Sequence, residues 1–165
     1  MTGNCETCGG HIVEALTAAG IDASELTEIG DAEEVDGFDT IIAGAPTWHT
    51  GADSERSGTA WDQWLYEELP NLAMDGKKVA VFGVGDQEGY ADNYCDAVGE
   101  LYDQFEAAGC KLFGKTSTEG YNHVESKAER DGKFLGCVFD EDNQYDLSEG
   151  RAQAWVAQLQ EEGFF

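Results

Sequence analysis

The sequence predicts an α/β fold in which helices cover both faces of a doubly wound parallel sheet. Two short apolar runs, Thr40 to Ala43 and Val79 to Val84, have the residues of parallel strands that are buried on both faces. Each run is followed by a segment whose apolar residues recur with helical spacing. A strand followed by a helix, repeated along the chain, is typical of a doubly wound sheet. A length of 165 residues fits a single domain, 1–165.

The chain begins with a predicted helix. Asn4 is the expected cap and Gly20 the expected end of this helix. Apolar or small residues recur between them with helical spacing, at Ile12, Val13, Leu16 and Ala19.

Two further helices are predicted after the two strands. Segment 61–69 places four apolar side chains on one face, at Trp61, Trp64, Leu65 and Leu69. Segment 91–109 forms a longer helix that ends at Gly109.

The last unit has its strand residues in two pieces, 110–116 and 133–139, on either side of a polar, Gly-containing segment, 117–132. A final helix is expected over about 148–162. Its buried residues are Trp155, Val156 and Leu159.

The composition is that of a packed but strongly acidic protein. Apolar residues make up 41% of the chain, whereas 9 Lys and Arg face 34 Asp and Glu, for a net charge of −25. Nucleic-acid phosphates would be repelled, so we expect no binding to nucleic acid. The charge favours a basic protein partner, or a surface that simply keeps molecules apart.

The cysteines indicate a reducing compartment. Five are scattered along the chain, an odd number without the spacing of a disulfide framework. No apolar run approaches the ~20 residues that span a bilayer, and no signal peptide opens the chain. We expect a soluble, intracellular monomer that does not insert into a membrane.

Three loops could carry chemistry, and each also has an ordinary structural interpretation. Residues 2–4 could bind an anion at a helix start or be a simple cap. The loop 43–61 holds Trp48, which could instead be a core residue. The loop 83–93 holds Tyr90 in what could be a surface turn. Together, two aromatic residues at one sheet edge could sandwich a flat heterocycle whose phosphate tail lies on the anion loop.

Three stretches then carry a resemblance to a known family: "APTWHTGADSERSGTAWDQWLY", "GVGDQEGYADNYCDA" and "STEGYNHVESKAERDGKFLGCVFDEDNQ". They resemble the long-chain flavodoxins of algae and cyanobacteria over essentially the whole chain. Residues 116–133 are similar to the loop that interrupts the last strand in the long-chain subfamily. The resemblance implies a flavodoxin-like three-layer α/β/α sandwich with strand order 2-1-3-4-5. It also implies an FMN-binding one-electron carrier, which is not an enzyme.

The resemblance further implies a set of cofactor-binding residues. The phosphate would lie on Thr2, Gly3, Asn4 and Cys5, with help from Thr47 and Trp48. Trp48 and Tyr90 would flank the isoalloxazine ring, and the peptide between His49 and Thr50 would face flavin N5. Gly85, Asp86, Asn93, Tyr94 and Cys95 would line the pyrimidine side, with Asp142 near the ribityl chain. The same loops contribute Pro46, Gly51 and Val84.

The family carries a central strand before the point that Met1 matches. We therefore expect this chain to lack its first strand, and residues 1–165 alone to show low stability and weak FMN affinity.

Two residues depart from the family pattern. His49 stands where relatives usually have Asn, so the one-electron reduced flavin could depend on pH. Cys5 replaces a hydroxyl residue and forms a C-x-x-C pair with Cys8 at a helix start, where a thiol pKa can fall. Redox or metal use of this pair is an alternative. His11 and His123 lack ligand spacing, so we expect no metal site.

The expected partners are basic docking surfaces of redox proteins, such as ferredoxin-NADP reductase and photosystem I. The compartment would be the chloroplast stroma in an alga and the cytoplasm in a bacterium. One alternative function is the FMN module of an oxidoreductase or quinone reductase, although no NAD(P) fingerprint or catalytic acid/base pair is visible. The other is a truncated interaction protein without FMN.

Overall fold

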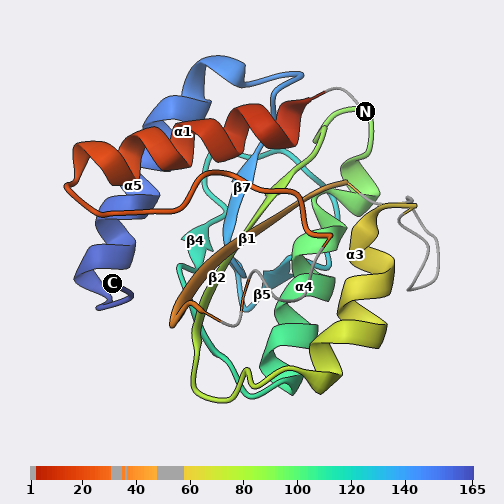
Figure 1. The fold of residues 1–165 in the computed structure, drawn as a ribbon. Helices are drawn as coiled ribbons and strands as arrows, with labels where there is room; N and C mark the ends of the chain where they lie inside the picture. The colour runs from red at the N-terminus through yellow and green to blue at the C-terminus, as the bar shows by residue number, and fades with distance from the viewer. Residues whose placement is uncertain (1–2, 31–34, 36, 48–57) are drawn as a thin grey trace.

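The computed structural model describes residues 3–30, 35, 37–47 and 58–165. Its main sheet is parallel and contains β1 (Thr40–Pro46), β2 (Lys78–Val84), β3 (Lys111–Phe113) and β7 (Cys137–Phe139). β2 lies in the middle, with β1 on one side and both β3 and β7 on the other (Figure 1). The chain therefore has the expected flavodoxin-like α/β architecture.

Helices cover both faces of this sheet. α1 (Asn4–Ala18) and α5 (Ser148–Glu161) pack on one face, and α3 (Ala60–Gln63) and α4 (Asp96–Ala107) pack on the other (Figure 1). Side chains alternate along β2, because Val79 and Val81 face α4 whereas Ala80 and Phe82 face α1 and α5. Every residue of β2 after Lys78 is buried, which confirms the prediction for this strand.

β1 differs from the prediction of a strand buried on both faces. It runs to Pro46, beyond the expected end at Ala43, and most of its residues are only half-buried. Among the described strands it pairs with β2 alone, which leaves its other edge with less cover. The strand that we expect to be missing would precede Met1, and this expectation stays a prediction.

The two ends of α1 follow different rules. The prediction that Asn4 caps the helix is wrong, because Gly3 occupies the cap position with φ 77° and Asn4 is the first helical residue. Gly20 ends the helix as predicted, with φ 74°. The amide of Gly20 donates to Thr17 O and that of Ile21 to Leu16 O, each at 3.0 Å. These two bonds form a Schellman motif.

The segment 61–69 is helical but not one regular helix. α3 continues as a π-helical turn, Trp64–Glu68, and a 3-10 turn, Leu69–Asn71, which contains Pro70. The expected apolar face is confirmed, since all four of its side chains are buried: Trp61, Trp64, Leu65 and Leu69.

The last strand is interrupted, as its two apolar pieces predict. β3 pairs with residues 78–80 of β2, and β7 pairs with residues 82–84. The segment between them contains β4 (Thr116–Ser117), β5 (Glu129–Arg130) and β6 (Lys133–Phe134), which form a small antiparallel sheet. We call residues 114–136 the insertion.

The remaining predicted helices are confirmed with small changes. The segment 91–109 consists of a 3-10 turn, Ala91–Asn93, and then α4, and the backbone of Gly109 at φ 85° follows its end. α5 buries the predicted Trp155, Val156 and Leu159. Within the described ranges, no helix is both long and apolar enough to cross a membrane.

Candidate functional site

Several segments meet at the carboxyl ends of the parallel strands, where α/β sheets bind ligands. Residues 85–95 follow β2 and residues 140–144 follow β7. The start of α1 joins them, because Cys8 Sγ donates to Glu141 Oε1 at 3.5 Å. Five of the predicted cofactor residues lie outside the described part of the chain: Thr2, Trp48, His49, Thr50 and Gly51.

The start of α1 is open enough for an anion. Gly3 has a left-handed backbone, and among the described residues other than its chain neighbours no atom lies within 4 Å of the position that a Cβ there would take. The helical hydrogen bonds begin with the amide of Thr7 donating to Gly3 O at 3.0 Å. The amides before it therefore point out of the helix end, next to the half-buried Asn4 and Cys5. A phosphate group fits this arrangement of amides and helix dipole.

The ends of β1 and β2 are tied together by side chains. Thr47 Oγ1 donates to the carbonyl oxygen of Val84 at 2.7 Å. The indole of Trp61 donates to Gly44 O at 3.2 Å. In this arrangement the hydroxyl proton of Thr47 goes to Val84, so its predicted help to a phosphate would need a different rotamer. Pro46, the last residue of β1, is half-buried between these contacts.

The loop after β2 presents Tyr90 to solvent. The side chain of Tyr90 is 52% exposed, so its ring is accessible for stacking on a ligand. Its amide donates to Asp86 O at 3.0 Å. Asp86 Oδ1 accepts from the amides of Glu88 and Gly89 at 3.0 and 2.8 Å. The pKa of Asp86 is lowered by the Gly89 amide and by the side chain of Asn143, so this carboxylate is ionised and holds the turn.

Gly85 and Asn93 lie on the same loop as Tyr90. The amide of Gly85 donates to Phe139 O at 2.9 Å, which fixes it beside the end of β7. The side chain of Asn93 is half-buried and donates to Asp96 Oδ2 at 3.3 Å.

Tyr94 and Cys95, also predicted on the pyrimidine side, point into the core. The side chain of Tyr94 is fully buried, with ring centroids of Tyr121, His123 and Phe134 at 5.5 to 6.0 Å. Its backbone amide donates to Glu125 O, and its carbonyl accepts from the Ser126 hydroxyl.

Cys95 is 1% exposed and has φ 53°, an unusual backbone for a residue with a side chain. Burial raises the pKa of its thiol. Both side chains are therefore buried against Gly85, where an added Cβ would lie 2.9 Å from Cys95 Sγ and from Tyr94 Cδ2.

The loop after β7 holds residues that the sequence interpretation missed. Asp140 is fully buried and accepts hydrogen bonds from Gln87 and Asn143. Asp142, the predicted ribityl-chain residue, is exposed, and its pKa is raised by partial burial and by neighbouring carboxylates. The available signal for Asp140 was its position directly after a predicted strand, in the run "DEDNQ".

The C-x-x-C pair does not have the lowered thiol pKa that its place at a helix start suggested. Burial raises the pKa of Cys5 from 9.0 to about 11. The pKa of Cys8 is raised further by burial and by the Glu141 carboxylate that its thiol contacts. Desolvation therefore outweighs the helix dipole here, and the thiols stay protonated near neutral pH. All five cysteines are free, and Cys95, Cys110 and Cys137 are buried as expected for packing residues.

Comparison with known proteins decides the family. A profile of the flavodoxin family matches residues 1–155. The chain belongs to the flavodoxin family. A flavodoxin from Picosynechococcus is 45% identical over 164 residues, which cover 96% of this chain and 91% of that protein. Flavodoxin 1 of Escherichia coli is 35% identical, with 98% and 89% covered.

Solved flavodoxin structures share the fold. A variant of the Fusobacterium nucleatum flavodoxin bound to flavin mononucleotide superposes with a TM-score of 0.83 at 27% sequence identity. The superposition covers 98% of this chain and 91% of that flavodoxin.

Proposed function

We propose that this chain binds FMN and works as a one-electron carrier rather than as an enzyme. The observation that carries the proposal is the pairing, at one sheet edge, of an open helix start at Gly3 with an exposed aromatic ring at Tyr90. A phosphate and a flat ring system are the two ends of FMN. Support also comes from the Fusobacterium flavodoxin, which is bound to flavin mononucleotide and shares this fold.

In this proposal the residues of the chain divide the work. The first amides of α1, from Gly3 to Cys5, hold the phosphate together with Thr2 and Thr47. Tyr90 would cover one face of the ring and Trp48 the other, while Gly85, Asp86 and the residues that follow would line its pyrimidine edge. The bound flavin supplies the capacity to accept and give up single electrons.

The remaining predicted contacts belong to the same proposal. Pro46 and Val84, the last residues of β1 and β2, would hold the starts of the two loops. The peptide between His49 and Thr50, with Gly51 after it, would face flavin N5; these residues lie outside the described part of the chain. Asn93, Tyr94 and Cys95 contribute backbone groups, and Asp142 lies near the ribityl chain.

The acidic composition of the chain affects the reduction potential of a bound flavin. A net charge of −25 opposes the addition of negative charge to a bound group. The chain therefore favours low potentials for the cofactor. The same charge attracts basic surfaces, so we propose docking partners of the ferredoxin-NADP reductase and photosystem I type.

Finer assignments complete the proposal. Residues 1–165 form one domain of the long-chain type, with residues 116–133 as the segment that defines this subfamily. The protein works as a monomer, in the chloroplast stroma of an alga or the cytoplasm of a bacterium.

Titration with FMN tests the cofactor, and a spectroelectrochemical titration then tests the one-electron role. We expect quenching of flavin fluorescence at one FMN per chain, followed by reduction in two resolved one-electron steps. A chain that folds cooperatively but leaves FMN free in solution would rule the proposal out. Rapid NADPH oxidation by the FMN-loaded protein alone would instead favour an oxidoreductase.

A further inference from the structure

Gln87 is a buried polar side chain on an exposed loop. It lies between Asp86 and the exposed turn of Tyr90, yet it is only 3% exposed. A buried amide needs partners for both its N–H groups and its oxygen. The partners of Gln87 come from two other segments of the chain.

The first partner is Asp140, at the end of β7. Asp140 Oδ2 accepts from Gln87 Nε2 at 2.7 Å and from the Gln87 backbone amide at 3.2 Å. Asp140 is fully buried, and the Asn143 amide, at 3.0 Å from Oδ1, helps to hold it. The Asn143 side chain contacts both Asp140 and Asp86, at 2.9 to 3.0 Å. The loop after β2 is therefore fixed to the loop after β7.

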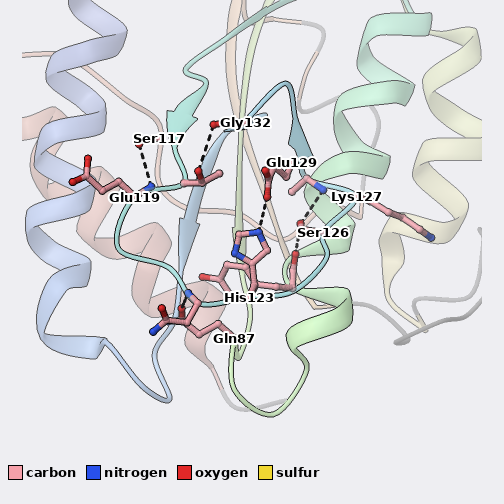
Figure 2. A network of polar contacts seen from close by, with 12 residues as sticks. Gln87, Ser117, Glu119, His123, Ser126, Lys127, Glu129 and Gly132 are labelled. Carbon is pink, nitrogen blue, oxygen red and sulfur yellow. Dashed lines mark hydrogen bonds and ion pairs between the residues drawn. The ribbon is translucent and has the colours of Figure 1, made fainter.

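The second partner is the insertion. Gln87 Oε1 accepts from the backbone amide of Asn122 at 2.7 Å (Figure 2). Farther along the same loop, Ala91 O accepts from the amides of Val124 and Glu125 at 2.8 and 3.0 Å. Figure 2 shows Gln87 and His123 on facing segments, with His123 bonded to Glu129 at 2.7 Å.

We propose that Gln87 is a positioning residue that holds the Tyr90 loop ready for the flavin ring by joining it to Asp140 and to the insertion. This inference rests on the proposed FMN function. Only two residues, Glu88 and Gly89, lie between Gln87 and Tyr90. The side chain of Gln87 bonds to both neighbouring segments. By contrast, the Asn143–Asp86 bond and the bonds to Ala91 O each reach only one of them. Loss of the Gln87 link loosens the loop between its remaining contacts, so FMN has to order it on binding, which weakens affinity.

The requirement for an amide is specific. Glutamate at this position has the same length, but repulsion from Asp140 would move its carboxylate away from the Asn122 amide. It has no N–H to donate, and its carboxylate would face the carboxylate of Asp140 at hydrogen-bond distance. Exchange of both partners, Gln87→Glu with Asp140→Asn, restores one donor and one acceptor between the two side chains. The backbone amide of residue 87 and Asn143 Nδ2 then lose the Oδ2 acceptor, so the restoration is partial.

The test compares four chains for FMN affinity by fluorescence titration and for ring environment by visible circular dichroism. They are Gln87→Glu, Asp140→Asn, the double exchange, and Gln153→Glu as the matched control. Gln153 also donates to a carboxylate, Glu149 Oε1 at 3.0 Å, but on the exposed face of α5. We expect Gln87→Glu to weaken FMN binding roughly tenfold or more and to change the visible spectrum. The double exchange should recover part of both, and Gln153→Glu should change neither.

Hydrogen exchange in the protein without FMN separates this inference from the proposed function. Gln87→Glu should lose protection at the Asn122 amide while the α4 amides keep theirs. Unchanged FMN affinity and spectrum in Gln87→Glu, or no recovery in the double exchange, would overturn the positioning role. Failure of the unaltered chain to bind FMN would instead overturn the proposed function. Protection of the Asn122 amide would then still test whether Gln87 joins the loop to the insertion.

Discussion

The hydroxyl of Thr47 donates a 2.7 Å hydrogen bond to the carbonyl oxygen of Val84, 37 residues away in the chain. This bond joins the residue after β1 to the last residue of β2. Two loops that begin at neighbouring strand ends thus start from a fixed separation. A fixed separation stabilises the fold, and it would also set the distance between the predicted FMN contacts on the two loops.

Thr47→Val should reveal the value of this bond. Valine keeps the branched shape but leaves Val84 O without the hydroxyl donor, which costs about 1 kcal/mol in the free energy of unfolding. Thr47→Ser keeps the hydroxyl and is the control. Urea denaturation measures both, and equal stability of the two variants would show that the bond contributes nothing.

Tyr90→Ala should weaken FMN binding without lowering the stability of the FMN-free protein. Stacking of an aromatic side chain on a flat heterocycle contributes ~1 to 3 kcal/mol, or roughly 5- to 150-fold in Kd. The ring is 52% exposed, so its removal takes little from the core. Tyr145→Ala is the matched control, because Tyr145 is 70% exposed in the 3-10 turn Tyr145–Leu147. Similar FMN affinities for the two variants would remove Tyr90 from the site.

Cys5 should make the protein less stable at alkaline pH. Burial keeps its proton in place up to about pH 11 in the folded chain, against an ordinary pKa of 9.0. Between these values the unfolded chain binds fewer protons, so stability falls as pH rises. For Cys5 alone the loss from pH 8 to pH 10 is about 1.4 kcal/mol. Denaturation of Cys5→Ala at both pH values should show a loss smaller by that amount, and a loss equal to that of the unaltered chain would contradict the burial argument.

Ionic strength should control reduction of the protein by a basic redox partner. The net charge of −25 attracts such a partner over a screening distance of about 30 Å at 0.01 M salt, which shrinks to about 10 Å at 0.1 M. Stopped-flow rates should therefore fall steeply with salt, whereas rates with an uncharged reductant should not. A flat profile with the protein partner would mean that the acidic surface serves solubility alone.

Periodic apolar residues made the framework predictable from the sequence. β2 is a run of small and apolar residues after Lys78, and burial on both faces requires such a run. Trp155, Val156 and Leu159 were recognisable because helical spacing places them on one face of α5. The interrupted last strand was visible because both of its pieces are apolar.

The details of the site depend on contacts between distant residues, which periodicity does not encode. Gln87 and Asp140 are 53 residues apart, and neither residue alone signals a buried pair. Tyr94 stands close to the Tyr90 motif in the sequence, but its ring packs inward against Tyr121 and His123 of the insertion. The raised pKa of Cys5 likewise comes from burial by the rest of the fold. The C-x-x-C pattern indicates only that the two cysteines lie at the start of a helix.

Gly114, where the insertion leaves β3, gives a last prediction about the interrupted strand. Its φ of 81° disfavours any side chain, and a Cβ there would lie 2.5 Å from Trp155 Nε1. That indole donates to Gly114 O at 2.8 Å, so a shift of the backbone would also weaken a buried hydrogen bond. Gly132 has a similar φ of 72°, but apart from its chain neighbours no atom of the described residues lies within 4 Å of its Cβ position.

Alanine at either glycine should cost about 1 to 2 kcal/mol for the left-handed backbone. Gly114→Ala should cost at least ~1 kcal/mol more than Gly132→Ala, because overpacking against Trp155 and Leu159 adds to the strain. Urea denaturation of the two variants measures the difference. Equal losses would mean that the indole moves aside freely, and the junction between the insertion and α5 would then not be a rigid part of the fold.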